Sequence, residues 1–243
     1  MMRLLLPLFV LVPMAGFLIS LLLKRRAEMA LSRVAYLTAA AQAALISGFI
    51  VAWAMGGFGA INVKEVVLFR SKDYEFFIDL YFDRVTAVYL FMGAVLTFLI
   101  TVYSRYYLHR EQGYKRFFNT ILFFLTGYSL TVLAGNFETL FIGWELLGLS
   151  SFLLIGFYRD RYLPVKNSVK VFSIYRVGDV GLILAMWMSH HLWHENITFH
   201  KLHNYVLVHD QLAAHSLVGI FISLAVLLAA AAKSAQLPFS SWL

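Results

Sequence analysis

The stretch LLLPLFVLVPMAGFLISLLL, residues 4–23, decides the fold class, because it holds no charged residue and ends at the basic triplet Lys24-Arg25-Arg26. An α-helix rises about 1.5 Å per residue and the hydrocarbon core of a bilayer is about 30 Å thick, so a span needs about 20 mostly apolar residues. The run is long for the hydrophobic region of a signal peptide, and no small-residue cleavage site follows it. We therefore predict that it is a retained first transmembrane helix.

Six further runs of predominantly apolar residues are long enough to cross a bilayer. They are Val34–Met55, Val85–Ser104, Phe117–Ala134, Thr139–Tyr158, Val169–Met188 and Leu212–Ala232. Of the 243 residues, 61% are hydrophobic and 14% are charged, against about 45–50% and about 25% in an ordinary soluble domain. A soluble core of this size could not bury so much apolar surface. The sequence therefore predicts an all-α polytopic membrane protein with about seven transmembrane helices in the lipid bilayer.

A more polar interval, residues 57–84, separates the second and third predicted spans. Charged and apolar residues alternate in it, as in Val63-Lys64-Glu65-Val66, and it is rich in β-branched and aromatic residues. This pattern predicts a short extramembrane β-hairpin. The expected organisation is two N-terminal helices in residues 1–56, an external segment in 57–84, and helices three to seven in 85–243.

The net charge of +7 is distributed between loops rather than along one face, which favours a role in membrane orientation over nucleic-acid binding. Cytoplasmic loops of membrane proteins carry an excess of Lys and Arg. Eleven such residues fall on one side of the predicted spans: Lys24, Arg25, Arg26, Arg33, Arg105, Arg110, Lys115, Arg116, Arg159, Arg161 and Lys166. Five fall on the other: Arg3, Lys64, Arg70, Lys72 and Lys201. The first side is predicted to be cytoplasmic, with the N-terminus outside, most simply in a bacterial inner (plasma) membrane.

Four ionisable residues interrupt the apolar runs: Glu145, Arg176, Asp179 and Lys233. Each costs roughly 2.5–3.5 kcal/mol at the centre of a membrane helix, so such groups face a bundle interior, pair, or line a hydrated path. Arg176 and Asp179 are three residues apart and share a helix face, so they can pair locally. Lys170 lies nearer the cytoplasmic end of its span and can extend its ammonium group to the interface.

Glu145 and Lys233 each lack an opposite charge in their own span. Glu145 must find a basic partner on another helix or stay protonated. Lys233 follows the uncharged run 217–232 and precedes Pro238 by five residues, which predicts a helix interrupted near the lysine, tolerated at membrane depth only against protein or water. The four charges together indicate a proton or cation path. The alternatives are a self-neutralising ion pair for Arg176 and Asp179, a protonated carboxyl with a packing role for Glu145, and a helix-end lysine that reaches the interface for Lys233.

Other chemistry has little support in the sequence. The chain contains no cysteine and therefore no cysteine-ligated iron–sulfur cluster, and it has no glycine-rich nucleotide-binding motif. We expect no cofactor and no redox centre. Seven of the eight histidines lie in residues 189–215, where we predict a solvated external loop; a metal site there is the weaker alternative.

Four stretches, ordered along residues 113–243, resemble the antiporter-like membrane subunits of respiratory complex I, specifically subunit L (chain 5). They are Gly113-Tyr-Lys-Arg-Phe-Phe118, the run Gly143-Trp-Glu-Leu-Leu-Gly through Ile155-Gly-Phe-Tyr158, Lys170-Val-Phe-Ser-Ile-Tyr-Arg-Val-Gly-Asp179, and Lys233-Ser-Ala-Gln-Leu-Pro238 with Trp242-Leu243. The resemblance implies a proton-translocating subunit of an NADH-quinone oxidoreductase-type complex with other membrane subunits as partners. It places the family's buried glutamate on Glu145, its broken-helix lysine on Lys233 and its arginine–aspartate pair on Arg176 and Asp179.

Two relatives of complex I subunit L share much of this pattern. They are the cation/proton antiporter subunits and the membrane subunit of bacterial inorganic-carbon uptake complexes; the loop Arg159–Lys166 keeps the second of these readings open. The family continues with a second helical repeat beyond the lysine, so we expect residues 85–243 to form an incomplete antiporter-like repeat and the chain to be the N-terminal part of a longer or split subunit. The expected mechanism is a charge switch at Glu145 and Lys233. A non-conducting membrane scaffold is the alternative from another class.

Overall fold

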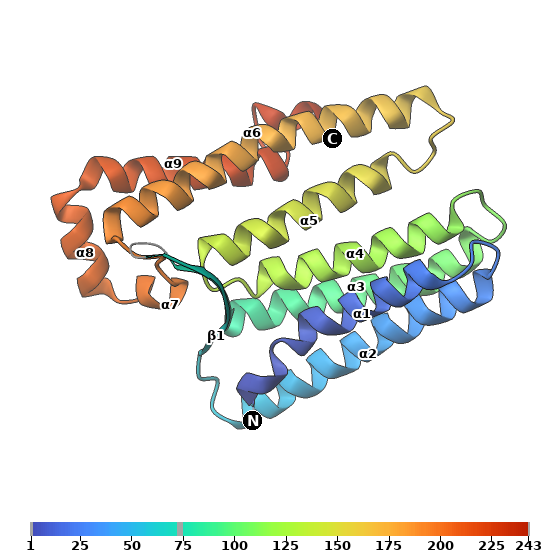
Figure 1. Cartoon of the computed structure of the whole chain (residues 1–243), viewed down its shortest axis with the longest axis horizontal. Helices are drawn as coiled ribbons and strands as arrows, with labels where there is room; N and C mark the ends of the chain where they lie inside the picture. Colours follow the sequence, from blue (N-terminus) through green and yellow to red (C-terminus); the bar gives the residue numbers. More distant parts are fainter. Residues whose placement is uncertain (1, 72–74, 243) are drawn as a thin grey trace.

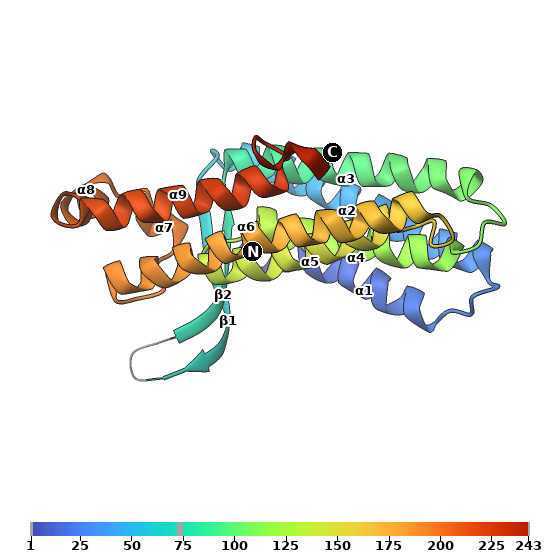
Figure 2. The ribbon, with the colours of Figure 1, turned by 90° about the horizontal axis from the view of Figure 1, so that it is seen from above.

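The computed structural model describes residues 2–71 and 75–242, apart from the side chains of Glu65 and Leu207. Lys72, which enters the charge count above, and Leu243 of the last matching stretch lie outside these residues. The long helices run side by side along one axis, and short loops join them at the two ends of the bundle (Figures 1 and 2). Six of the predicted runs fall mainly on one long helix each, with an antiparallel hairpin between the second and third.

The helices and strands follow one another in the order η1 (Met2–Leu5), α1 (Leu8–Leu22), α2 (Glu28–Met55), β1 (Ile61–Arg70), β2 (Glu75–Phe82), α3 (Arg84–Tyr107), α4 (Tyr114–Val132), α5 (Phe137–Ile155), α6 (Tyr162–Trp193), α7 (Phe199–Leu202), α8 (Tyr205–Ala214), α9 (Ser216–Lys233) and η2 (Phe239–Trp242). Helices α2 and α6 are longer than predicted, because apolarity marks only the part of a helix that lipid would cover. The seventh predicted run, Leu212–Ala232, begins too early: its first residues belong to the short helix α8, and the long helix α9 begins only after His215. Gly113 takes a φ of 108° at the start of α4, a left-handed conformation that suits glycine.

Six helical segments in the described ranges are long and apolar enough to cross a membrane; α4 is not among them. Helix α4 forms as predicted, but Lys115 and Arg116 in its first turn and Asn119 in the next lower its mean hydropathy. It packs between α1 and α5 and buries ten of its residues. A helix shielded by its neighbours needs fewer apolar side chains toward lipid, so hydropathy underestimates it.

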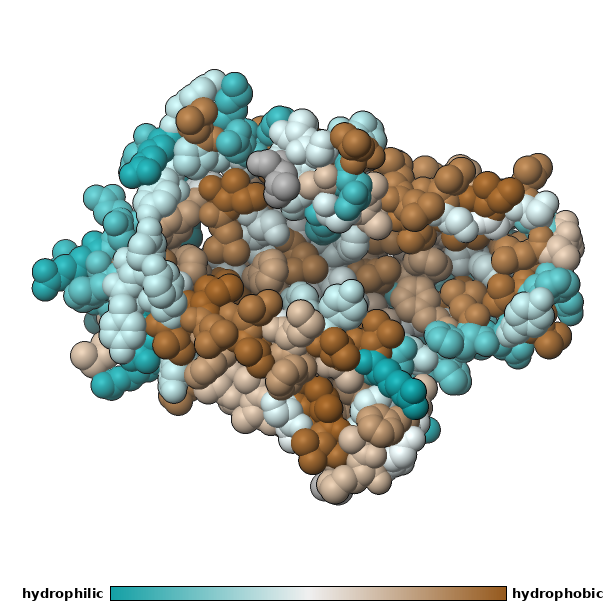
Figure 3. Space-filling model, turned by 180° about the vertical axis from the view of Figure 1, so that it is seen from behind, coloured by the Kyte–Doolittle hydropathy of each residue, from teal (hydrophilic) through white to brown (hydrophobic). Residues whose placement is uncertain are grey.

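Apolar side chains cover the middle of the bundle, and hydrophilic residues gather at its two ends in the view of Figure 3. Many large hydrophobic residues are exposed, among them Leu99 on α3, Val180 on α6 and Leu227 on α9. Exposed apolar surface of this extent marks contact with lipid or with other subunits. Together with the helix lengths, it identifies an integral membrane protein.

The predicted hairpin is present. Strands β1 and β2 pair antiparallel, with register shifts between Lys64 and Val66 and between Val67 and Phe69. The base of the hairpin is tied to the α4–α5 turn, because Tyr81 donates its backbone N–H to the carbonyl of Leu133, 2.7 Å away. The histidine-rich segment differs from the predicted loop, since it contains α7 and α8. Most of its histidines are exposed, in agreement with a solvated surface.

Candidate functional site

Helix α5 carries the first of the predicted charges. Its N-cap is Asn136, whose side-chain oxygen accepts the backbone N–H of Thr139 at 2.9 Å. Further along, Gly143 lies against α4 so closely that a Cβ at this position would be 2.6 Å from the backbone nitrogen of Thr131. This close approach fixes the depth and rotation of the next two residues, Trp144 and Glu145.

Arg176 on α6 joins two carboxylates. Its Nη2 lies 2.8 Å from Oε2 of Glu145 and 2.9 Å from Oδ2 of Asp179. The indole N–H of Trp144 donates to the other oxygen of Asp179 at 2.8 Å. The side chain of Asp179 is 5% exposed, against 29% for Glu145 and 40% for Arg176. The expected local pair of Arg176 and Asp179 is therefore present, and Glu145 has found its basic partner on another helix.

Lys233 is the last residue of α9, which agrees with the predicted interruption. The segment that follows α9 lies beside α6, with the centre of the Trp242 ring 5.4 Å from that of the Tyr175 ring (Figure 1). The ammonium group donates to the backbone carbonyl of Trp144 at 2.6 Å and lies 4.2 Å from the centre of the Trp144 ring and 5.3 Å from that of Tyr175. Contacts of this kind hold a cation through ring electrons and one carbonyl dipole.

The two cations flank one point on α5. A Cβ on Gly148 would lie 3.5 Å from Nζ of Lys233 and 3.7 Å from Nη2 of Arg176. Gly148 is three residues after Glu145 and so lies on the same helix face. In the described part of the chain Glu145 pairs with Arg176 and not with Lys233. Its second oxygen, Oε1, is buried without a hydrogen-bond partner there.

Close packing between α6 and α9 holds Lys233 near Arg176. A Cβ on Gly178 would lie 2.9 Å from Cβ of Ala232, and one on Gly181 would lie 2.7 Å from the carbonyl oxygen of Ala225. Beyond α9, the indole N–H of Trp242 donates to the carbonyl of Ala232 at 3.0 Å. The carbonyl of Ala232, near the end of α9, therefore has a hydrogen-bond donor inside the protein.

Lys170 lies apart from this cluster. Its ammonium group donates to the backbone carbonyl of Ser241, in the segment that follows α9. Trp144, Tyr175 and Gly148 complete the cluster, and reasoning from charge alone missed them. The aromatic residues beside the charged residues of apolar helices are the signal that could have identified them.

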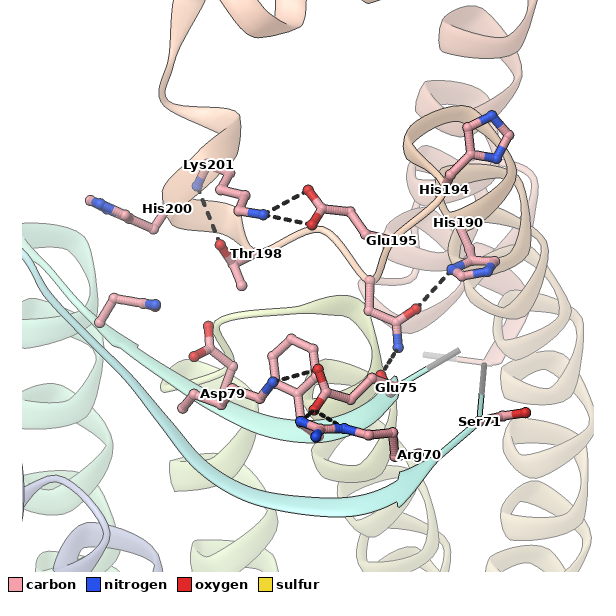
Figure 4. Close-up of a pocket in the computed structure, with 14 residues that line it drawn as sticks. Arg70, Ser71, Glu75, Asp79, His190, His194, Glu195, Thr198, His200 and Lys201 are labelled. Carbon is pink, nitrogen blue, oxygen red and sulfur yellow. Dashed lines mark hydrogen bonds and ion pairs between the residues drawn. The ribbon is translucent and has the colours of Figure 1, made fainter. Parts of the chain in front are cut away.

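A separate polar pocket of about 950 Å³ lies between the hairpin and the α6–α7 connection (Figure 4). Asn196 bridges the two, because its amide donates to the carbonyl of Glu75 at 2.6 Å and its oxygen lies 3.0 Å from Nδ1 of His190. Five charged residues of the pocket pair with one another: Glu75 with Lys64 and Arg70, and Lys201 with Glu195. In the described ranges, no three metal-ligating side chains of this region or any other gather as a metal site.

Two protein-family models match this chain. The family model described as "NADH:quinone oxidoreductase/Mrp antiporter, TM" matches residues 134–243, and that described as "NADH-Ubiquinone oxidoreductase (complex I), chain 5 N-terminus" matches residues 68–118. The chain belongs to the family of complex I subunit L and Mrp antiporter subunits. The resemblance predicted from the sequence is thereby confirmed.

Individual relatives belong to the same kind of subunit. NADH-quinone oxidoreductase subunit L of Escherichia coli (strain K12) is 31% identical over 242 residues, which is 98% of this chain and 38% of that protein. The chloroplastic NAD(P)H-quinone oxidoreductase subunit 5 of Fagopyrum esculentum subsp. ancestrale is 33% identical over 165 residues, 66% of this chain and 21% of that protein. This chain thus spans about two fifths of the bacterial relative.

Two solved structures share the fold. A chain of the membrane-bound sulfane sulfur reductase, an archaeal respiratory membrane complex, superposes with a TM-score of 0.74 at 15% identity, covering 98% of this chain and 46% of that one. A chain of the Mrp complex from Dietzia sp. DQ12-45-1b gives a TM-score of 0.74 at 21% identity, covering 97% of this chain and 24% of that one. At these identities the likeness concerns the fold alone.

Proposed function

We propose that this chain is part of a proton-translocating membrane subunit similar to NADH-quinone oxidoreductase subunit L, with no redox centre of its own. The observation that carries the proposal is the cluster in which Arg176 joins Glu145 to Asp179, while Lys233 at the end of α9 approaches the same face of α5 at Gly148. Charged side chains inside membrane-spanning helices are energetically costly, so their presence indicates a functional site. Subunits of a hetero-oligomeric membrane complex are the proposed partners, and a bacterial inner membrane with the N-terminus outside is the proposed location.

The proposed mechanism is an exchange of partners by Glu145. With the carboxylate on Arg176, the contacts of the Lys233 ammonium group in the described part of the chain include a carbonyl and two aromatic rings but no ion pair. A carboxylate close to a lysine favours its charged form, and removal of that carboxylate favours release of the proton. Movement of Glu145 between Arg176 and Lys233 would therefore change the proton affinity of Lys233. Because Gly148 has no side chain, no Cβ stands between the two cations at the point on α5 that both approach.

Residues 85–243 act in this proposal as the antiporter-like part, and residues 1–56 and 57–84 as a helical support and an external segment. Asp179 and Trp144 position Arg176, and Lys170 connects α6 to the end of α9. The ion remains to be tested, because the Mrp likeness also favours a cation/proton antiporter.

The test compares Glu145→Gln with Glu145→Asp in the complex purified through a tag on this chain and reconstituted in vesicles. The glutamine variant removes the charge at nearly constant shape, so it should assemble normally and lose most proton uptake. The aspartate variant keeps the charge and should retain a substantial part. Full proton uptake by Glu145→Gln would leave the glutamate with a packing role.

Two further readouts separate the alternatives. Replacement of Na⁺ by K⁺ in the assay should leave proton uptake unchanged, whereas dependence on Na⁺ would identify a cation/proton antiporter. A requirement for bicarbonate or CO₂ would identify an inorganic-carbon uptake complex. Wild-type protein that assembles but moves no proton under any condition would identify a scaffold.

A further inference from the structure

A second pocket, of about 570 Å³, opens at the opposite end of the bundle from the hairpin. Residues at the end of α1, the start of α4 and the second half of α5 line it. The loops that join α1 to α2, α3 to α4 and α5 to α6 gather at this end (Figures 1 and 2). Its volume falls within the roughly 300–1,000 Å³ of small-molecule sites.

The polar side of this pocket is cationic. Arg25, Lys115, Arg116 and Arg159 line it, and no Asp or Glu is among the described lining residues. The charges of Arg25 and Arg159 act on Arg116 as like charges, with Asp160 as the opposing charge nearby. Like charges so arranged repel one another, and an anion between them would relieve the repulsion.

Two of these cations are held in place by the protein. Lys115 donates to the carbonyls of Leu21 and Leu23, at 2.8 and 2.5 Å, and so caps the end of α1. Arg116 donates to the carbonyl of Phe157 at 2.5 Å, with its guanidinium over the ring of that residue. By contrast, Arg25 and Arg159 are exposed and form no ion pair with a carboxylate in the described part of the chain.

The pocket also holds one donor and one acceptor that the protein leaves unused. Nε of Arg116 and Oδ1 of Asn119 are buried and have no hydrogen-bond partner among the described atoms. Buried polar atoms normally find a partner. A phosphate oxygen would accept from Arg116, and a hydroxyl group of a glycerol head group would donate to Asn119.

The remaining wall is apolar. Phe17 and Leu21 of α1, Phe123 of α4, and Leu149 and Leu153 of α5 complete the lining. Leu21 and Leu149 are 45% and 43% exposed, so they offer apolar surface beside the cations. A free phosphate ion would leave this wall uncovered, whereas a lipid would cover it with its acyl chains.

We infer that this pocket binds an anionic glycerophospholipid, with its phosphate among Arg25, Lys115, Arg116 and Arg159 and its acyl chains against α1 and α5. Basic pockets between membrane helices are suited to such head groups. The inference does not depend on proton translocation. It assigns the pocket a ligand that would tie the first helix to α4 and α5.

The test measures lipid binding to the detergent-solubilised chain by native mass spectrometry, with phosphatidylglycerol, phosphatidylcholine and glycerol 3-phosphate as probes. Arg25→Gln/Arg159→Gln removes the two exposed cations and leaves the helix contacts of Lys115 and Arg116 intact. At roughly 1 kcal/mol per basic residue, each loss weakens binding about fivefold, so the double variant should bind phosphatidylglycerol about 25-fold more weakly.

The matched control is Arg110→Gln/Lys166→Gln, which removes two exposed charges at the same end but outside the pocket. It should bind phosphatidylglycerol as the wild type does. Equal loss in both double variants would show only a diffuse attraction and overturn the proposal. Glycerol 3-phosphate bound as tightly as phosphatidylglycerol, or phosphatidylcholine bound equally well, would overturn it too.

Discussion

Arg176 is the residue whose replacement tests the charged cluster most directly. Arg176→Gln removes a cation that contacts both Glu145 and Asp179 within 3 Å. Breaking a buried ion pair by removal of one partner typically costs about 3–5 kcal/mol, because it leaves an uncompensated buried charge. Arg176 is 40% exposed without lipid around it, so we expect the lower end of this range, about 3 kcal/mol.

Removal of either carboxylate should destabilise the protein less than removal of the arginine. In Glu145→Gln the arginine keeps Asp179, and in Asp179→Asn it keeps Glu145 while Trp144 keeps an acceptor. Each of these single changes should therefore cost less than Arg176→Gln, about 1–2 kcal/mol. The triple variant removes all three charges and should recover much of the loss, since none of these three positions is left buried and charged without a partner. Lys233 keeps its contacts with the Trp144 carbonyl and with two aromatic rings.

The assay is reversible unfolding in mixed detergent and SDS micelles, followed by tryptophan fluorescence, for the wild type, the three single variants and the triple variant. Coupled residues give non-additive free energies. If the cost of the triple variant equalled the sum of the three single costs, the residues would not depend on one another, and the reasoning about the cluster would be wrong.

Three further predictions concern the helix packing, the hairpin and the topology. Gly178→Ala should destabilise the chain by about 1–3 kcal/mol, because the added Cβ overpacks against α9. The control Gly48→Ala has open space around its Cβ and should stabilise the chain by about 0.5–1 kcal/mol. Thermal unfolding in detergent compares the two variants, and equal shifts of the unfolding temperature would contradict close α6–α9 packing. The pKa of Glu75 lies below its usual value, chiefly because of its hydrogen bond to Lys64 and then that to Arg70. The stabilisation of the hairpin by ionised Glu75 is therefore fully present above the unfolded pKa of about 4.3 and is lost as the pH falls through the lower folded pKa. Protease cleavage of the hairpin should therefore rise at acid pH in the wild type but not in Glu75→Gln. Accessibility tags at Gly113 should report the cytoplasm and tags at Asn204 the outside, and a cytoplasmic signal from Asn204 would contradict the proposed orientation.

The fold can be predicted from the sequence to a large extent, because every membrane span needs about 20 mostly apolar residues in a helix. All seven apolar runs are mainly helical, and the alternation in residues 57–84 does form a hairpin. Helix α4 is the exception, because its mean hydropathy is too low for a membrane span on its own. It lies between α1 and α5, which shield it. Helix contacts of that kind depend on tertiary packing, which a single sequence does not report.

For the candidate site, the sequence identifies the charges but not their partners. The cost of burial singles out Glu145, Arg176, Asp179 and Lys233, and spacing alone predicts the pair on α6. That Glu145 contacts Arg176 while Lys233 contacts Trp144 depends on how α5, α6 and α9 are rotated against one another. Such rotations are set by close approaches such as that of Gly178 to Ala232.

The length of α6 has an electrical consequence. Its 32 residues extend about 48 Å, well beyond a hydrocarbon core of about 30 Å, so both ends reach water if the helix is centred in the bilayer. Arg176 and Asp179 flank its midpoint and then lie where about half of the transmembrane potential has fallen. A unit charge that leaves that depth for either surface would gain or lose about 1.2 kcal/mol per 100 mV. The membrane potential would then contribute almost equally to proton movement from this depth to either surface of the membrane.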